Sequence, residues 1–233
     1  MAEDGKNEKN RFSRRDFVVS GGAVIAGGAL SVASPGALGA AVETKAVSAY
    51  PLSEGYLVYD SRKCSGCQSC MLTCALVHCG EAAPSYARIQ VARNVFDPYP
   101  QDIQIHVCRQ CPDPLCVKRC PSGACRVSAE NGNVRMIDAE KCVGCKTCID
   151  ACPLVPHRVV FIAEARKAAK CDLCADAPYF SKKGGASGRQ ACVTVCPAGA
   201  LKCESSTPRQ KDNVGYDVNL ALSKSSTKAP SGR

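Results

Sequence analysis

The sequence predicts a small α+β domain of short strands and short helices that depends on its cysteines more than on a large apolar core. Nineteen of the 233 residues are cysteine, aromatic residues make up 5% of the chain, and tryptophan is absent. A chain with so few large apolar side chains needs disulfides or bound metal as additional support. Short strand-like runs alternate with the cysteine-rich segments, which completes the prediction.

The first 41 residues are predicted to be an export signal. The sequence Ser-Arg-Arg-Asp-Phe at 13–17 is a twin-arginine motif, and a Gly/Ala-rich apolar run follows it to about residue 32. This run is too short and too rich in glycine for a membrane span, which needs roughly 20 strongly apolar residues. We therefore expect a twin-arginine signal over 1–41, a linker over 42–55, and a periplasmic protein that is soluble or peripheral.

The domain itself is predicted over 56–203. Strand-like composition occurs at 56–59, 89–95, 103–107, 134–137 and 159–162. Short helices are expected after the third cysteine of each of the first three motifs described below, at Cys70, Cys116 and Cys148. From residue 204 onward the apolar pattern is lost, so we predict a polar C-terminal tail over 204–233 that is partly disordered.

Sixteen of the cysteines fall into four motifs with similar spacing. In chain order they are Cys64-x2-Cys67-x2-Cys70-x3-Cys74, Cys108-x2-Cys111-x4-Cys116-x3-Cys120, Cys142-x2-Cys145-x2-Cys148-x3-Cys152 and Cys171-x2-Cys174-x17-Cys192-x3-Cys196. Three closely spaced cysteines can bind three corners of one cubane 4Fe–4S cluster. The fourth follows where the chain turns helical, and in two-cluster ferredoxins it binds the other cluster. Cys79, Cys125 and Cys203 lie outside the motifs and are interpreted as small buried thiols.

Two other roles for the cysteines compete with iron–sulfur clusters. Disulfides are compatible with export, but these runs crowd their cysteines too closely for ordinary pairing, and nineteen is an odd number. Zinc sites use pairs of the C-x2-C type, not triplets followed by a fourth cysteine and, in three of the four motifs, a proline. The spacing therefore favours 4Fe–4S clusters over both.

The formal net charge of +9 does not indicate a nucleic-acid partner. Four thiolates around an oxidised cluster core bring a charge of about −2, so four clusters bring about −8 and nearly neutralise the basic side chains. The chain also lacks a basic stretch interleaved with aromatic residues, which would stack on bases. We expect no nucleic-acid binding.

The four motifs resemble those of the four-cluster ferredoxin-like subunits that serve molybdenum and tungsten oxidoreductases, including iron–sulfur subunits of the dimethyl sulfoxide reductase type. The match covers about 56–203 and includes the x4 gap of motif two, the long gap of motif four, and phrases such as Cys120-Pro121-Ser122-Gly123-Ala124, Lys141-Cys142-Val143-Gly144-Cys145 and Lys170-Cys171-Asp172-Leu173-Cys174. The resemblance implies two ferredoxin-like βαββαβ modules with nested cluster pairing, one formed by motifs one and four and the other by motifs two and three.

The resemblance also implies the ligands of four 4Fe–4S clusters. Cluster 1 would be held by Cys64, Cys67, Cys70 and Cys196, cluster 2 by Cys108, Cys111, Cys116 and Cys152, cluster 3 by Cys142, Cys145, Cys148 and Cys120, and cluster 4 by Cys171, Cys174, Cys192 and Cys74. Because all sixteen positions are cysteine, we expect four cubanes and no 3Fe–4S centre. Motif one lacks the proline that follows the other motifs and motif four contains an insert, but neither change is expected to remove a cluster.

No residue set for catalysis is evident in the sequence. It contains no G-x-G-x-x-G, nucleophile elbow or metal-hydrolase set, and its histidines are single residues: His78, His106 and His157. We expect an electron-transfer subunit, not an enzyme, that relays single electrons between a catalytic subunit and a membrane quinone-reactive subunit or cytochrome. By resemblance the catalytic subunit is a molybdenum or tungsten pterin enzyme. The alternatives are a free exported polyferredoxin and a non-redox zinc or disulfide scaffold.

Overall fold

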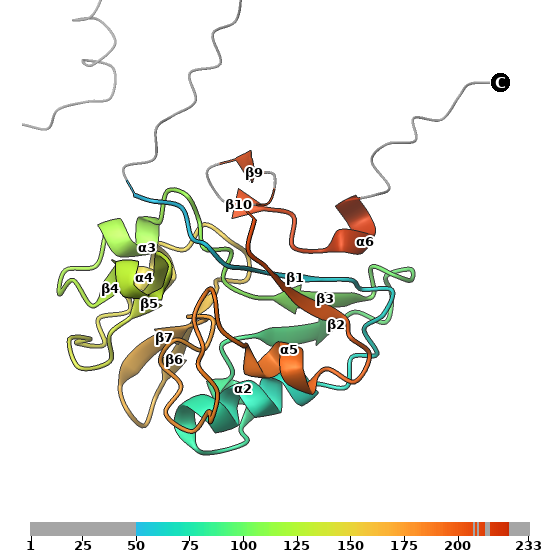
Figure 1. The fold of residues 1–233 in the computed structure, drawn as a ribbon, viewed down its shortest axis with the longest axis horizontal. Helices are drawn as coiled ribbons and strands as arrows, with labels where there is room; N and C mark the ends of the chain where they lie inside the picture. The colour runs from blue at the N-terminus through green and yellow to red at the C-terminus, as the bar shows by residue number, and fades with distance from the viewer. Residues whose placement is uncertain (1–49, 207, 209, 213–214, 224–233) are drawn as a thin grey trace, which may run out of the picture. The chain divides into compact units, whose positions relative to one another are not determined.

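The computed structural model describes residues 50–206, 208, 210–212 and 215–223, all of which belong to one unit, Ala46–Arg233. The predicted export signal over 1–41 and most of the predicted linker over 42–55 lie outside these residues. Within the described part of the chain, ten short strands form five antiparallel pairs, with short helices between them (Figure 1). This small mixed architecture is consistent with a ferredoxin-like 4Fe–4S fold.

The same order of elements occurs twice along the chain. The first half contains β1 (Tyr56–Tyr59), α2 (Ser69–Cys79), β2 (Gln90–Arg93), β3 (Ile103–His106), α3 (Leu115–Lys118) and β4 (Cys125–Ser128). The second half contains β5 (Val134–Ile137), α4 (Thr147–Asp150), β6 (Val159–Ile162), β7 (Lys167–Lys170), α5 (Ala191–Val195) and β8 (Leu201–Glu204). Two 3₁₀ turns, Pro84–Tyr86 and Ala129–Asn131, interrupt the connections. Each half therefore reads strand, helix, strand, strand, helix, strand.

Strand pairing links the two halves at their outer strands. β2 pairs with β3 and β6 pairs with β7 as local hairpins, and β4 pairs with β5 across the junction between the halves. β1 pairs with β8, with Tyr56 opposite Glu204 and Tyr59 opposite Leu201. The first and last strands of the repeated order therefore lie side by side, and α2 packs against α5 beneath them (Figure 1).

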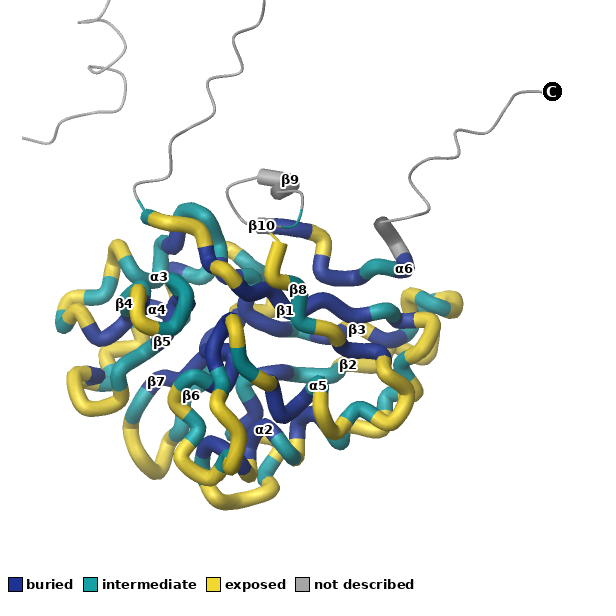
Figure 2. Tube along the Cα trace, viewed as in Figure 1, coloured by how far each residue is buried: buried dark blue, intermediate teal, exposed yellow. Residues whose placement is uncertain are grey.

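The core is centred on β1 and is small. All four residues of β1 are buried, and the largest buried cluster combines this strand with cysteines of motifs one, two and four (Figure 2). Thiol groups thus occupy positions that bulky apolar side chains fill in other domains. No helix among the described residues has the length and apolar character that crossing a membrane requires.

Part of the segment predicted as a polar tail packs onto this core. It contains β9 (Gln210–Asp212), β10 (Gly215–Tyr216) and α6 (Leu220–Ser223). The Tyr216 side chain is fully buried, its ring meets the Tyr56 ring edge-on at 5.1 Å, and its hydroxyl donates a hydrogen bond to the carbonyl of Leu57 at 3.0 Å. These contacts extend the buried core beyond residue 204, where too few apolar residues occur to form a sequence pattern.

Candidate metal centre

The four cysteine motifs begin with the same backbone turn. The residue before the second cysteine has a positive φ in every motif: 71° at Gly66, 46° at Gln110, 72° at Gly144 and 57° at Leu173. A residue with a side chain loses roughly 1–2 kcal/mol of stability in this left-handed conformation. Motifs two and four keep the turn despite this loss, because they have Gln110 and Leu173 where the other motifs have glycine. The turn brings the first two thiols of each motif around a common space.

One such space, here named cavity A, has a volume of about 350 Å³ including space open to solvent. Its walls contain the first three cysteines of motif one and the last cysteine of motif four: Cys64, Cys67, Cys70 and Cys196. The remaining wall is apolar or uncharged, with Val91, Ile105 and Leu201 from β2, β3 and β8. Cys67 is exposed, which places cavity A at the surface. These four cysteines are the set that the resemblance implied for cluster 1.

A second space, cavity B, measures about 290 Å³ by the same definition. It is lined by the first three cysteines of motif four and the last of motif one: Cys171, Cys174, Cys192 and Cys74. All four are buried, with exposed fractions of 5–8%. The resemblance implied this set for cluster 4, so the last cysteines of motifs one and four are exchanged between cavities A and B.

Cavity C, about 390 Å³, is lined by the first three cysteines of motif two and the last of motif three: Cys108, Cys111, Cys116 and Cys152. This is the set implied for cluster 2. The fourth implied set, Cys142, Cys145, Cys148 and Cys120, lies beside it. Cys142 and Cys148 belong to one buried cluster, and Cys120 packs against that cluster. Cys145 is exposed, and the Thr147 hydroxyl donates a hydrogen bond to its sulfur at 3.4 Å.

The last cysteine of every motif accepts a hydrogen bond from a backbone N–H group. The donors and distances are Arg88 to Cys74 at 3.4 Å, Cys125 to Cys120 at 3.3 Å, Arg158 to Cys152 at 3.3 Å and Ala200 to Cys196 at 3.2 Å. An N–H group that points at a cluster-bound sulfur stabilises the thiolate that a metal requires. The bonds therefore orient these four sulfurs as acceptors.

Burial makes the thiolate form of several motif cysteines costly without a cation nearby. Burial, aided by neighbouring sulfurs, raises the pKa of Cys70 and of Cys111 to about 12 and that of Cys148 to about 11. At the exposed Cys67 the pKa is instead lowered, because Ser69 is hydrogen-bonded to this sulfur. Thiols packed in this way are matched by a positively charged iron core, which deprotonates its ligands on binding.

An ion-paired network closes one side of cavity B. His78 Nε2 lies 3.1 Å from one carboxylate oxygen of Asp172, and the Arg88 guanidinium lies 2.7 Å from the other. Burial would raise the pKa of Asp172, but Arg88 and His78 outweigh burial and hold it at about 2. Burial likewise opposes protonation of His78, but the bond to Asp172 raises its pKa to about 9. The other two histidines line none of the three cavities.

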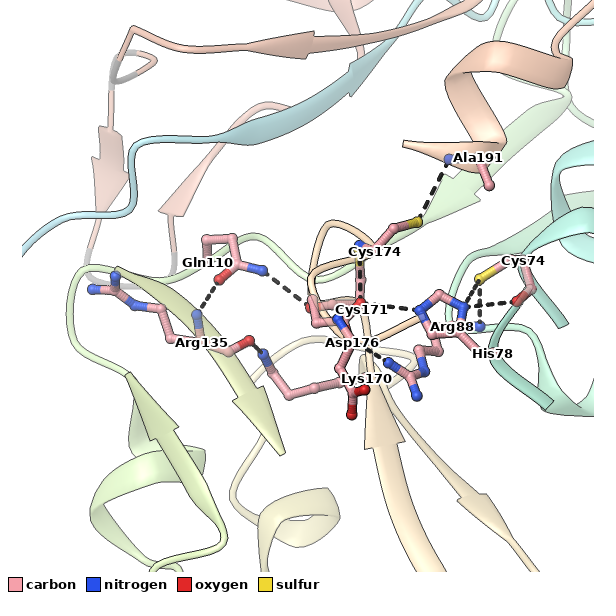
Figure 3. Close-up of polar contacts among 11 residues, drawn as sticks. Cys74, His78, Arg88, Gln110, Arg135, Lys170, Cys171, Cys174, Asp176 and Ala191 are labelled. Atoms are coloured by element: carbon pink, nitrogen blue, oxygen red, sulfur yellow. Dashed lines mark hydrogen bonds and ion pairs between the residues drawn. The ribbon is translucent and has the colours of Figure 1, made fainter. Parts of the chain in front are cut away.

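Three buried polar side chains near cavity C carried no signal in the sequence: Gln110, Arg135 and Lys170. Figure 3 shows Gln110 between Arg135 and Cys171, with Lys170 extending to the Arg135 carbonyl oxygen, to which it donates a hydrogen bond. Burial would lower the pKa of Lys170, but the surrounding sulfurs, led by Cys108, raise it above its ordinary value. The Lys170 ammonium therefore stays charged.

The three cysteines outside the motifs have separate environments. Cys125 is buried in β4, and its hydrogen bond to Cys116 lowers the pKa of the Cys116 thiol. Cys79 ends α2 and Cys203 lies in β8, and burial raises the pKa of both. None of the nineteen cysteines, all of which lie in the described residues, forms a disulfide.

The positions of the cysteines distinguish a site for a metal cluster from a site for a single metal ion. Across the described ranges, no three His, Cys, Asp or Glu side chains converge on a point where one metal ion would bind. A cubane cluster does not need such convergence, because each of its four ligands binds a different iron atom. Cavities lined by four separated sulfurs suit a cluster of that kind.

Known proteins are similar in sequence to more than half of this chain. The family described as "4Fe-4S dicluster domain" matches residues 101–206. The electron transport protein HydN of Escherichia coli is 33% identical over 171 residues, which cover 64% of this chain and 86% of HydN. The polyferredoxin-like subunit of the Pyrococcus furiosus aliphatic sulfonate oxidoreductase is 37% identical, covering 60% of this chain and 70% of the relative. The thiosulfate reductase electron transfer subunit PhsB of Salmonella typhi is 33% identical, covering 63% and 73%.

These relatives are named as electron transport proteins or electron-carrying subunits, not as catalytic enzymes. Each of them aligns with this chain over 70–86% of its own length. The chain therefore belongs to the 4Fe–4S dicluster-domain family of iron–sulfur electron-transport proteins.

Proposed function

We propose that this chain is the electron-transfer iron–sulfur subunit of an oxidoreductase complex and holds four 4Fe–4S clusters on its sixteen motif cysteines. The observation that carries the proposal is that cavities A, B and C are each lined by four cysteines, three from one motif and one from another. A bound 4Fe–4S cluster supplies one-electron chemistry that ordinary side chains lack.

The protein's own residues bind and shield these sites. Backbone N–H groups hold the last sulfur of each motif. The buried strand β1 and the buried side chains of Ile103 and Ile105 in β3 shield the sites from water. The pairing of β1 with β8 and of β4 with β5 supports two nested ferredoxin-like modules. In this arrangement motifs one and four share one module, and motifs two and three share the other.

The exposure of the ligands supports a relay with two accessible ends. Cys67 of cavity A and Cys145 of the fourth set are exposed, whereas all four cysteines of cavity B are buried. An electron that enters at one exposed site and leaves at the other would pass through the buried sites. We propose a catalytic partner at one end, a molybdenum or tungsten pterin enzyme by the resemblance of the motifs, and a membrane quinone-reactive subunit or cytochrome at the other.

Cofactor content tests the number of clusters. Anaerobically purified protein is expected to contain about 16 iron atoms and about 16 inorganic sulfides per chain, four times the content of one cubane. Iron near eight atoms per chain, or zinc in stoichiometric amounts, would refute the four-cluster assignment.

Purification from the native host tests the partner. Mild anaerobic affinity purification is expected to recover a large pterin-containing subunit in stoichiometric amount, and the isolated chain is expected to turn over no substrate. A monomer without a partner that still exchanges electrons with a soluble dye would instead identify a free polyferredoxin.

We also propose that the protein works in the periplasm after export by the twin-arginine route. This route carries folded proteins, so it suits a chain whose cofactors are inserted in the cytoplasm. Replacing both Arg14 and Arg15 by lysine is expected to leave the protein in the cytoplasm with its clusters present. Export of this double variant at the normal level would contradict the proposal.

A further inference from the structure

The three cysteine-lined cavities differ in the charges on their walls. Among the described residues that line cavity C, four are cationic and none is acidic; the cations are Arg109, Arg135, Arg158 and Lys170. Cavity A has no charged residue in its wall apart from its cysteines. In cavity B, the cations Arg88 and His78 are ion-paired with Asp172. Cavity C therefore carries four cations without a carboxylate, a larger excess of positive charge than in either of the other two cavities.

Two of these cations are fixed in the interior. Lys170 is 2% exposed and Arg135 is 1% exposed. The Lys170 ammonium donates to the Arg135 carbonyl, the Arg135 amide donates to Gln110 Oε1 at 2.7 Å, and Gln110 Nε2 donates to the Cys171 carbonyl at 3.1 Å (Figure 3). This chain of bonds connects β7, β5, motif two and motif four and holds the Lys170 ammonium in the interior.

The described residues provide no carboxylate as a counter-charge for this pair. In the described part of the chain, no carboxylate forms an ion pair with Lys170 or Arg135. The Arg135 guanidinium uses Nε and one Nη to reach the carbonyls of Cys111 and Asn133, and its Nη2 is buried without a hydrogen-bond partner. Because an uncompensated buried charge destabilises a fold by several kcal/mol, these cations point to an anionic occupant of cavity C.

We propose that Lys170 and Arg135 raise the reduction potential of the cluster bound by Cys108, Cys111, Cys116 and Cys152. This inference rests on the proposed function, which places a cluster in cavity C. Reduction adds one electron and no proton to the site, and therefore one negative charge. Burial opposes that charge, whereas buried cations stabilise it and are little screened by salt. The two residues thus keep the cluster in cavity C reducible within the relay.

The test is potentiometric EPR of the full-length holoprotein, titrated anaerobically with dithionite. Loss or alteration of one signal in Cys111→Ser identifies the signal that belongs to cavity C. In Lys170→Met, the ratio of reduced to oxidised cluster at a fixed potential is expected to fall at least tenfold at this signal, a shift of about 59 mV for a one-electron couple. The signals of the other clusters are expected to shift less.

Two variants control for charge and position. Lys170→Arg keeps the charge, so the reduction potential of the cluster in cavity C is expected to stay close to the wild-type value. Lys182→Met removes the same charge from an exposed loop, where solvent screens it, and is expected to shift no signal. If Lys170→Met does not assemble its cluster, Arg158→Gln removes another cation of the same wall and is expected to lower the same potential.

The outcomes separate this inference from the proposed function. If no EPR signal of the wild-type protein is lost or altered in Cys111→Ser, both the cluster in cavity C and this inference are refuted. An intact signal with an unchanged potential in both Lys170→Met and Arg158→Gln would refute the inference alone. Equal shifts of all clusters would also refute it, because they would reflect a general change in the fold.

Discussion

Gly66 and Gly144 occupy the same position in motifs one and three, before the second cysteine, but their surroundings differ. Their φ angles are 71° and 72°, so an alanine at either position adopts the same disfavoured backbone. A Cβ on Gly66 would lie 3.5 Å from Ile103 Cδ1, an ordinary contact. A Cβ on Gly144 would clash with the backbone carbonyl oxygen of Arg166, in the turn between β6 and β7. Alanine substitution at the two positions therefore separates backbone strain from steric clash.

The expected loss in free energy of unfolding has two contributions, the strained backbone and the steric clash. The left-handed conformation costs an alanine roughly 1–2 kcal/mol, offset by about 0.4–1 kcal/mol from the reduced freedom of the unfolded chain. Gly66→Ala is therefore expected to cost about 1 kcal/mol. Gly144→Ala must also displace the turn, which adds about 1–3 kcal/mol of the kind measured for overpacked sites. A difference of about 2 kcal/mol corresponds to a factor of about 30 in an equilibrium constant.

Cluster proteins unfold irreversibly, so the assay is a rate. Holoprotein is diluted anaerobically into guanidinium, and loss of the visible iron–sulfur absorbance is followed for wild type and both variants. Gly144→Ala is expected to bleach about 5–30 times faster than Gly66→Ala, because the native state carries strain that opening relieves. Equal iron contents before dilution establish equal loading. Equal bleaching rates for the two variants would refute the assignment of the clash.

Two further predictions use the same protein. Cys74→Ser is expected to alter the EPR signal that Cys171→Ser alters, because both cysteines line cavity B, and a match with Cys64→Ser instead would contradict the exchange of last cysteines. Asp172→Asn is expected to destabilise the protein by about 3–5 kcal/mol, because two buried cationic neighbours lose their counter-charge. Asp60→Asn, which breaks a pair with an exposed arginine, is expected to cost at most about 1 kcal/mol, and equal bleaching rates for the two variants would refute this difference.

The strands that the sequence predicted are those with β-branched or aromatic residues. The segments 56–59, 134–137 and 159–162 coincide with β1, β5 and β6, and 103–107 exceeds β3 by one residue. The prediction of 89–95 was too long, because β2 ends at Arg93, where the next backbone N–H pairs with Asp102 across the turn. β4, β7 and β8 were missed because each includes charged or small residues, such as Lys-Ala-Ala-Lys in β7, and forms only through its partner strand.

In the candidate site, too, some residues are evident from the local sequence and others only from long-range packing. The cysteines of motifs one to three are recognisable because the first three of each motif lie within a few residues of one another, and motif four keeps its first pair and its last pair together. Gln110, Arg135 and Lys170 have no such local signal, because their burial arises from packing between segments 25 to 61 residues apart. The pairing of Cys196 with motif one came from family resemblance, and spacing alone would not have assigned it.

The pairing of β1 with β8 has a consequence for how the chain matures. Cys64 and Cys196, which line one cavity, are separated by most of the domain, and β1 gains its partner strand only when residues 201–204 exist. Such distant pairing makes folding slow and leaves cavity A without its fourth cysteine, Cys196, throughout synthesis of the intervening chain. Under the proposed function, a cluster in cavity A would gain its fourth ligand only after nearly the whole polypeptide has been synthesised. A chain truncated before Cys192 would lack ligands in both cavity A and cavity B.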